Sequence, residues 1–232
     1  MPYLNEAADV VELHLGAPGV ELDESNPENR FRLEWLDEVE RLLAEVSANP
    51  KPLVLTATGK YFTNGLDTDH IFAAPDQLPA YLDRVHALYS TILTLPVPTV
   101  AAINGHAFGA GAMLALCADQ VIMRTERGFW SLPEAALNMP FTRGMATLLR
   151  TRLTDRTATE AMYSSRRYGA DDAVAAGIVD EAVPVERLAA RAAELAAARA
   201  GTVGPNLAVI KRGLRGPLLA DLALPTPAGV LA

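Results

Sequence analysis

Hydrophobic and polar residues alternate at helical spacing in the first part of the chain. Between Phe31 and Val46, apolar side chains recur every three or four positions, and charged side chains occupy the positions between them. This pattern predicts an amphipathic helix, which the Asn-Pro-Lys-Pro segment at 49–52 would end. The following run, Leu53–Thr58, is apolar or small on both faces, as is typical of a buried strand in a parallel sheet.

The alternation of helix and strand continues along the chain. The pattern predicts a helix at 78–93, a strand at 99–103, a glycine-rich turn, a helix at about 111–118 and a strand at 120–124. Helix formers then dominate, and the expected elements are helices at 142–153, 156–164, 170–176 and 184–200 and a short extended piece at 180–183. We therefore expect an α/β fold with a core over residues 1–185 and a helical C-terminal region over residues 186–232.

Composition and charge narrow the class of protein. Of the 232 residues, 50% are hydrophobic, which is enough for a continuous core, and the formal net charge is -8. This charge disfavours binding to nucleic acids and to anionic membrane surfaces. The single cysteine, Cys117, excludes an intramolecular disulfide. The sequence has no secretory leader pattern, no C-terminal peroxisomal address and no apolar run as long as a membrane span, so we expect a cytoplasmic protein.

The glycine-rich turn at 103–114 follows a predicted strand and opens a predicted helix, where backbone N–H groups lack intrahelical partners. A dinucleotide fingerprint would need a glycine in place of Leu114. A P-loop would need Gly-Lys-Ser/Thr, which neither this turn nor the segment 59–61 contains. A nucleophile elbow would need a hydroxyl or thiol side chain in place of Ala107. The sequence therefore excludes these three uses of the turn.

A use that remains is direct binding of negative charge by backbone N–H groups. Small residues at Gly109, Ala110 and Gly111 would let a ligand oxygen approach the backbone, although the same run also suits close packing of a helix on a strand. A second turn, Thr-Asn-Gly-Leu-Asp at 63–67, follows the buried strand and also contains a glycine. Together the two turns indicate a candidate oxyanion hole with two N–H donors.

Four segments of the chain, in order and covering nearly its whole length, resemble the signatures of one family. They are Phe62–Asp67, Asn104–Gly111, Leu132–Pro140 and Ala173–Pro184. The family is the crotonase, or enoyl-CoA hydratase/isomerase, superfamily. The resemblance implies a spiral core of parallel strands with a helical C-terminal layer. It also implies an acyl-CoA thioester as substrate, coenzyme A entering only as part of that substrate, no further cofactor or metal, and a homotrimer or dimer of trimers.

The resemblance further implies roles for particular residues. The backbone N–H groups of Asn64 and Ala110 would bind the thioester oxygen as it becomes an enolate, and Glu134 would be the catalytic acid/base. The remaining substrate-binding residues that it implies are Gly65, Leu66, Asp67, Gly109, Met113 and Arg30. Arg30 or Lys60 would meet the phosphates of coenzyme A.

The reaction depends on the number of carboxylates in the site. Hydratases of this superfamily use two glutamates to hold a water molecule, and this chain resembles them at Glu134 but has Met113 at the other position. One carboxylate suits a Δ3,Δ2-enoyl-CoA isomerase, in which a single base moves a proton from C2 to C4. An enoyl-CoA hydratase that uses another carboxylate stays open as the alternative. A non-catalytic acyl-CoA binding protein is the alternative from another class.

The surroundings of the ionisable side chains complete the expectations. The apolar neighbours of Glu134 in the sequence should raise its pKa by desolvation, whereas a surface glutamate that caps the next helix would keep an ordinary pKa. We expect His106 to be a packed or surface residue, and Asp67 and Asp119 to cap helices. The other histidines, His14, His70 and His86, show no metal-ligand spacing.

Overall fold

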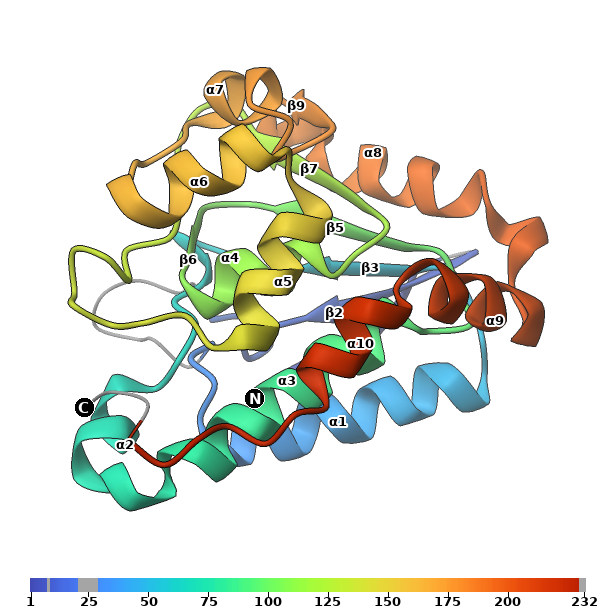
Figure 1. The fold of residues 1–232 in the computed structure, drawn as a ribbon. Coiled ribbons are helices and arrows are strands. Elements are labelled where there is room, and N and C mark those ends of the chain that lie inside the picture. The colour runs from blue at the N-terminus through green and yellow to red at the C-terminus, as the bar shows by residue number, and fades with distance from the viewer. Residues whose placement is uncertain (8, 21–28, 230–232) are drawn as a thin grey trace.

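The computed structural model describes residues 1–7, 9–20 and 29–229, which form an α/β fold (Figure 1). These residues contain a six-stranded sheet of order β1-β2-β3-β5-β7-β9 and a three-stranded sheet of order β4-β6-β8. Neighbouring strands are parallel in both sheets, except that β1 and β2 are antiparallel. The strands of the large sheet are β1 Tyr3–Ala7, β2 Val10–His14, β3 Leu53–Thr56, β5 Thr99–Ile103, β7 Gln120–Arg124 and β9 Glu181–Val183. The small sheet consists of β4 Tyr61–Thr63, β6 His106–Phe108 and β8 Trp130–Ser131.

Both faces of the large sheet are covered, because its central strands carry apolar side chains on both sides. On β3, Leu53 and Leu55 belong to the main core, whereas Val54 packs on the opposite face with Val100 and Ile122. The helix α8, Val185–Ala197, covers that opposite face with Leu188, Ala192 and Ala196. The main core lies between the other face and the helices α1 Leu33–Ala48, α3 Leu78–Leu93 and α4 Ala110–Leu116.

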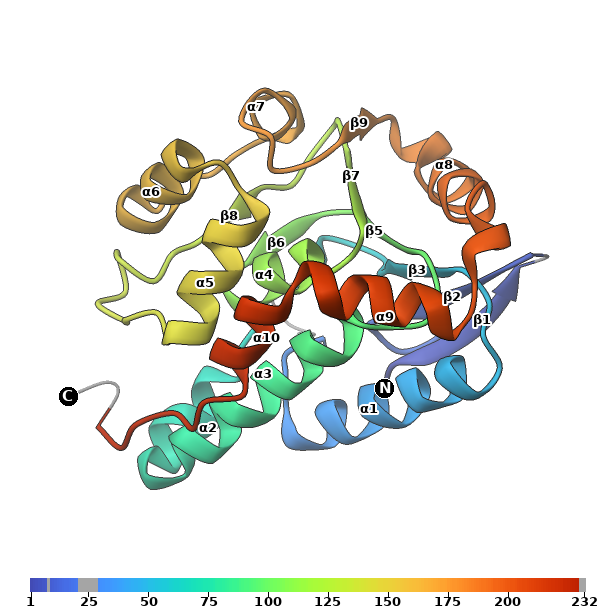
Figure 2. The ribbon, with the colours of Figure 1, turned by 45° about the vertical axis from the view of Figure 1, so that its right-hand side comes forward.

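The second half of the chain is mostly helical, and its helices α5 Arg143–Arg152 and α10 Gly216–Leu222 pack on α4 and α3. Its other helices are α6 Asp155–Ser164, α7 Ala170–Ala175, α8 and α9 Pro205–Leu214. Threonine caps two of them, since the Thr142 side chain accepts a hydrogen bond from Met145 N–H and the Thr154 side chain accepts one from Thr157 N–H. Helix α10 packs on both α5 and α3, so the end of the chain lies beside the elements that surround the pocket described below (Figure 2).

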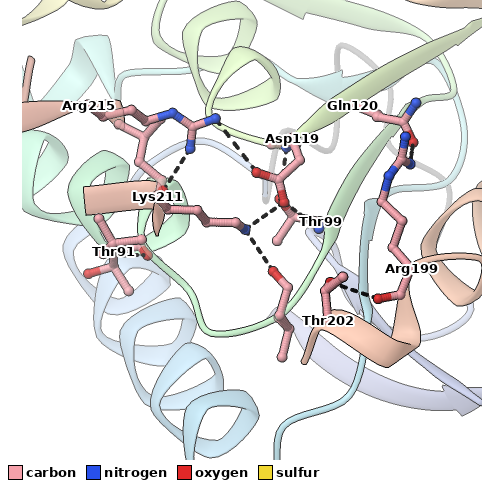
Figure 3. Close-up of polar contacts among 12 residues, drawn as sticks. Thr91, Thr99, Asp119, Gln120, Arg199, Thr202, Lys211 and Arg215 are labelled. Carbon is pink, nitrogen blue, oxygen red and sulfur yellow. Dashed lines mark hydrogen bonds and ion pairs between the residues drawn. The ribbon is translucent and has the colours of Figure 1, made fainter. Parts of the chain in front are cut away.

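A cluster of charged side chains, Asp119, Lys211 and Arg215, joins the C-terminal part of α9 to the core (Figure 3). The Lys211 ammonium, which is 4% exposed, donates to the Val97 carbonyl at 2.7 Å and to Asp119 Oδ2 at 2.5 Å. Arg215 donates to the carbonyl of Leu93, at the last residue of α3, at 2.7 Å. Asp119 also accepts from Thr99 N–H at 2.9 Å. The prediction that Asp119 caps a helix is therefore wrong: it pairs with cations brought from the C-terminal helices.

The helices and strands predicted from residue 31 onward are found, with ends that shift by a few residues. The glycine-rich turn needs a correction, because the short strand β6 lies inside it and pairs with β4 and β8. The sequence pattern also missed the strands β1, β2, β4 and β8 and the helix α2 Thr68–Ala73, and it gave no bounds for α9 and α10 within the expected helical C-terminal region. No helix in the described residues is long and apolar enough to cross a membrane.

Candidate active site

The first turn connects β4 to α2 and is held by hydrogen bonds to the segment 29–31. Gly65 has φ +76°, a conformation that glycine adopts without strain. Its N–H donates to Thr63 Oγ1 at 3.0 Å, and the same hydroxyl donates to the Asn29 carbonyl at 2.9 Å. The Gly65 carbonyl accepts from Phe31 N–H at 2.9 Å. These bonds fix both peptide groups of Gly65 and thereby the orientation of the adjacent Asn64 N–H.

A buried tyrosine holds the end of the same turn. The Tyr81 hydroxyl accepts from Asp67 N–H at 2.9 Å and donates to the Phe31 carbonyl at 2.8 Å. Burial raises the pKa of Tyr81, so this hydroxyl stays protonated. Asp67 stands at the N-terminal boundary of α2, but its side chain makes no capping hydrogen bond there. The predicted capping role of Asp67 is therefore wrong.

The second turn connects β6 to α4 through Gly109, which has φ +50°. Gly109 N–H donates to the Ser131 carbonyl at 3.0 Å, which ties the turn to β8. The buried Tyr89 hydroxyl donates to the Ala110 carbonyl at 2.8 Å. The Trp130 indole donates to the Ala112 carbonyl at 3.0 Å. Side chains from α3 and β8 thus hold the first turn of α4 in place.

The two turns are in direct backbone contact. A Cβ atom on Gly65 would lie 2.8 Å from the Phe108 carbonyl oxygen and 2.9 Å from the Gly111 nitrogen, and one on Gly111 would lie 2.5 Å from Thr63 Cγ2. Neither Asn64 N–H nor Ala110 N–H donates a hydrogen bond to any residue that the structure describes. Both residues line one pocket. Two backbone N–H donors that have no partner among the described residues are therefore available to a ligand in this pocket.

The pocket encloses about 690 Å³ of empty space, including the open solvent at its mouth. Its lining is mainly apolar and comes from both turns, from α2, α3, α4 and α5, and from the segment 133–142. The residues that line it are Asn64, Leu66, Thr68, Ile71, Leu78, Leu82, Phe108, Gly109, Ala110, Met113, Pro133, Glu134, Leu137, Met139, Pro140, Thr142 and Met145. Glu134 is the one ionisable side chain in this described lining.

Glu134 lies beside the second turn. Its Oε1 is 3.0 Å from the position that a Cβ atom on Gly109 would take, so glycine there leaves room for the carboxyl group. Its Oε2 is buried and has no hydrogen-bond partner among the described residues. Burial raises the pKa of Glu134 to about 7. A carboxyl group in this state can accept and release a proton near neutral pH.

The raised pKa and its cause, desolvation by burial, agree with the expectation, although the expected apolar neighbours in the sequence are only part of the surroundings. The sequence neighbours Ala135, Ala136 and Leu137 are exposed, and Leu137 is 58% exposed. Pro133 and Leu137 still line the pocket beside Glu134, and residues distant in sequence, such as Ile71, complete its wall. The alternative of a helix-capping surface glutamate is wrong, because Thr142 caps the next helix and Glu134 Oε2 is buried.

Met113 also lines the pocket, on α4 and three residues after Ala110, which places the two on neighbouring turns of one helix face. It is buried, and no second carboxylate occurs in the described lining. The pocket thus combines one carboxyl group, two N–H donors and an apolar wall.

Several predicted contacts lie outside this lining. Gly65 and Asp67 support the first turn without lining the pocket. Arg30 pairs with Asp69 at 3.4 Å on the surface beside α2. His106 is packed, as expected, with its ring stacked on Phe108 at 5.0 Å.

The apolar wall of the pocket was not predicted from the sequence. It contains Ile71, Leu78, Leu82 and Met145, from three helices. The spacing of Leu78 and Leu82 on one face of a helix predicts that both are buried, but it does not show whether they line a pocket or belong to the core. Among the described residues, no group of three or more His, Cys, Asp or Glu side chains is placed to hold a metal ion.

Comparison with known proteins agrees with this arrangement. A family model described as enoyl-CoA hydratase/isomerase matches residues 16–218. The chain is 32% identical over 165 residues to the peroxisomal enoyl-CoA delta isomerase 2 of Arabidopsis thaliana, covering 67% of this chain and 69% of that protein. It is 31% identical over 218 residues to a probable enoyl-CoA hydratase of Rhodobacter capsulatus, covering 92% of this chain and 84% of that protein. Human mitochondrial delta3-delta2-enoyl-CoA isomerase has a TM-score of 0.85 at 22% identity, covering 95% of this chain and 85% of that one.

The parallel-strand core with its helical layer is the fold of the crotonase superfamily. At 22% identity the structural likeness establishes the fold alone. The family match extends over most of the chain, and the chain belongs to the enoyl-CoA hydratase/isomerase family, which acts on acyl-CoA thioesters.

Proposed function

We propose that this protein is a Δ3,Δ2-enoyl-CoA isomerase. The observation that carries the proposal is that the described lining of the pocket has one carboxyl group, that of Glu134, and has Met113 at the position of the second. Moving a double bond needs one group that takes a proton from C2 and returns it at C4. Adding water needs a second group that orients the water molecule, and a thioether side chain cannot do this.

The two turns supply the electrostatic part of the proposed reaction. The thioester oxygen accepts hydrogen bonds from Asn64 N–H and Ala110 N–H, which have no other partner among the described residues. Negative charge moves onto this oxygen as C2 loses its proton, so the donors bind the dienolate more strongly than the substrate. Each preorganised donor of this kind contributes about 3 kcal/mol at the transition state.

Glu134 transfers the proton in the proposed reaction. With a pKa of about 7, it is partly ionised at neutral pH and removes the proton from C2 as a carboxylate. Its neutral form then protonates C4, and the carboxylate is regenerated without any outside acid or base. The unpartnered, buried Oε2 supports this role, because no described residue holds that oxygen away from a substrate.

The second candidate function is enoyl-CoA hydratase. The 31% identity to the probable hydratase of Rhodobacter capsulatus, over 92% of this chain, favours it. A hydratase here would orient its water molecule with a polar group other than a second carboxylate. A non-catalytic acyl-CoA binder is the third possibility, and the raised pKa of Glu134 argues against it.

Coenzyme A would have to be bound by local donors, since the net charge of -8 repels a polyanion. Arg30 directly precedes Phe31, whose N–H is bonded to the first turn, and Lys60 precedes the same turn in the chain. We propose these two side chains as contacts for the phosphates. For the assembly we propose a homotrimer or a dimer of trimers, and the exposed apolar residues Val209, Ile210 and Leu214 of α9 offer a surface to bury.

The function is tested with a panel of 3-enoyl-CoA and 2-enoyl-CoA thioesters of several chain lengths. The isomerase proposal predicts conversion of the 3-enoyl esters to conjugated products, followed by their absorbance. Tight binding of both classes without turnover of either would instead identify an acyl-CoA binder. Light scattering that finds a stable monomer of about 25 kDa, the mass of the chain, would overturn the proposed assembly.

A further inference from the structure

One side chain of the pocket wall combines burial with an unused hydrogen-bonding capacity. Thr142, at the N-terminus of α5, is 6% exposed and lines the pocket among apolar residues. Besides Thr142 and Glu134, two polar residues line the pocket, Asn64 and Thr68, and both are only half-buried. Thr142 is therefore a buried polar side chain in an otherwise apolar part of the pocket wall.

The partners of the Thr142 hydroxyl can be counted. The oxygen accepts from Met145 N–H at 3.2 Å and lies 2.8 Å from Nε2 of His86. His86 is 2% exposed, and its Nδ1 is buried without a partner among the described residues. Burial lowers the pKa of His86, so the ring is neutral at pH 7 and carries one N–H.

The position of that N–H decides what the threonine can do. If Nδ1 carried the proton, a buried N–H donor would have no partner, which is rarer and more costly than an unpaired acceptor nitrogen. We therefore assign the proton to Nε2, which donates to Thr142 Oγ1. Both acceptor positions of the hydroxyl are then used, by His86 and by Met145. Its own hydrogen has no acceptor among the described residues.

We infer that Thr142, held by His86, donates a hydrogen bond to an oxygen atom on the acyl chain of the substrate. The pocket then favours acyl-CoA thioesters whose chain carries a hydroxyl, keto or ether oxygen beyond the reacting carbons. This inference rests on the proposed function in so far as an acyl-CoA thioester occupies the pocket. Thr142 also lines a second cavity, whose lining includes residues 224–227, and a water molecule bound there is the rival acceptor for its hydrogen.

The test compares the binding of two kinds of non-reactive ligand to the full chain by calorimetry. The ligands are octanoyl-CoA and a set of hydroxyoctanoyl-CoA esters in which the hydroxyl group moves from C6 to C8, where it is too far from the thioester to form a five- or six-membered lactone. One buried hydrogen bond predicts that at least one hydroxylated ester binds about five- to tenfold more tightly than octanoyl-CoA. No hydroxylated ester binding more tightly than octanoyl-CoA would overturn the inference.

Three variants of the donor and its support sharpen the result. Thr142→Val keeps the shape of the side chain and should reduce the preference to within about twofold, whereas Thr142→Ser should retain it. His86→Leu frees the hydroxyl to reorient and should weaken the preference. A preference that survives in Thr142→Val would overturn the inference.

Thr154→Val is the matched control, because Thr154 also caps a helix with its side chain but does not line the pocket. Loss of a cap destabilises both valine variants by about 1 kcal/mol, so the binding ratio and not stability is the readout. The proposed function is checked separately, by isomerisation of unsubstituted 3-octenoyl-CoA. Binding without isomerisation would overturn the isomerase and leave the ratio readable, whereas no binding of any ester would overturn both.

Discussion

Two regions meet at the pocket and are built in opposite ways. The turns at Asn64 and Ala110 are fixed by backbone contacts in which even a Cβ atom would collide. The segment that carries Glu134 runs over the surface, with Ala135, Ala136 and Leu137 exposed. In the proposed reaction the turns act through their backbone N–H groups, so the side chains at the two donor positions take no part in it. The exposed segment acts through one side chain, whose chemistry depends on what surrounds it in space.

The first prediction, with the largest expected effect, breaks the contact between the two turns. Gly65→Ala would place a Cβ atom 2.8 Å from the Phe108 carbonyl oxygen at a residue with φ +76°. The turns must then separate, and we expect loss of both N–H contacts to the substrate and a fall in kcat/KM of at least about 1,000-fold. Steady-state kinetics on a 3-enoyl-CoA measures it.

Gly177→Ala is the control for this change. Gly177 has a similar φ of +68°, but an added Cβ would meet no atom within 4 Å. This variant should lose about 1 kcal/mol of stability from backbone strain and keep its activity. Equal loss of activity in both variants would show that strain, and not the contact between the turns, explains the result.

The second prediction removes the chemistry of the exposed segment and leaves the turns intact. Glu134→Gln should lower isomerase turnover by at least about 100-fold, because general-base contributions are commonly of this size. Binding of a saturated acyl-CoA should change little, since the N–H donors stay in place. Glu160→Gln, on a surface helix, serves as the control. Near-normal turnover in the Glu134 variant would place the base elsewhere.

A third prediction concerns the desolvation of Glu134. Its folded pKa of about 7 is above the ordinary glutamate value of 4.5, so the folded state holds this proton more tightly than the unfolded state. The resulting stabilisation is complete below about pH 4.5 and is lost as pH rises through 7. Relative to Glu134→Gln, wild type should lose about 3 kcal/mol of unfolding free energy between pH 4 and pH 8.5.

Denaturant unfolding of both proteins across this pH range measures the difference. The kcat/KM of wild type should rise with pH toward a plateau, with a midpoint near 7, because the base acts as a carboxylate. Parallel stability curves for the two proteins would mean that the carboxyl group is solvated and that its pKa is ordinary.

A smaller effect is expected from a side chain that supports the second turn. Tyr89→Phe removes the 2.8 Å hydrogen bond to the Ala110 carbonyl and leaves the ring in place. We expect kcat to fall about tenfold while KM changes little, because the looser turn weakens a contact that matters most in the transition state. Tyr163→Phe, at a residue that is 70% exposed, is the control. Loss of stability without a change in kcat would contradict a role in positioning Ala110.

The contrast between the two regions also explains what the sequence could predict. The helices α1 and α3 follow directly from apolar periodicity, because each buries a long, regular face, and the strands β3, β5 and β7 follow from short apolar runs that are buried on both sides. The strands β4, β6 and β8 have two or three residues each and exist through pairing with one another. A pairing between segments far apart in the chain leaves no local pattern, so these strands were missed.

The candidate site divides along the same line. The residues of the two turns, together with Glu134 and Met113, lie in motifs short enough to recognise in the sequence, and the structure brings Asn64, Leu66, Gly109, Ala110, Met113 and Glu134 to one pocket. The wall from α2, α3 and α5 depends on how helices pack, and so does the burial of Glu134. The same limit applies to Asp119, whose partner Lys211 is 92 residues away.

The central claim is that a single carboxyl group in a pocket that also contains Met113 makes this protein an isomerase, and one comparison of rates tests it most directly. Isomerisation of 3-hexenoyl-CoA and hydration of crotonyl-CoA are measured in wild type and in Met113→Glu. Wild type should isomerise at least about 100-fold faster than it hydrates, and the variant should gain measurable hydration, limited because an unsupported buried carboxyl group favours its neutral form. A wild type that hydrates crotonyl-CoA as fast as it isomerises 3-hexenoyl-CoA would contradict the account.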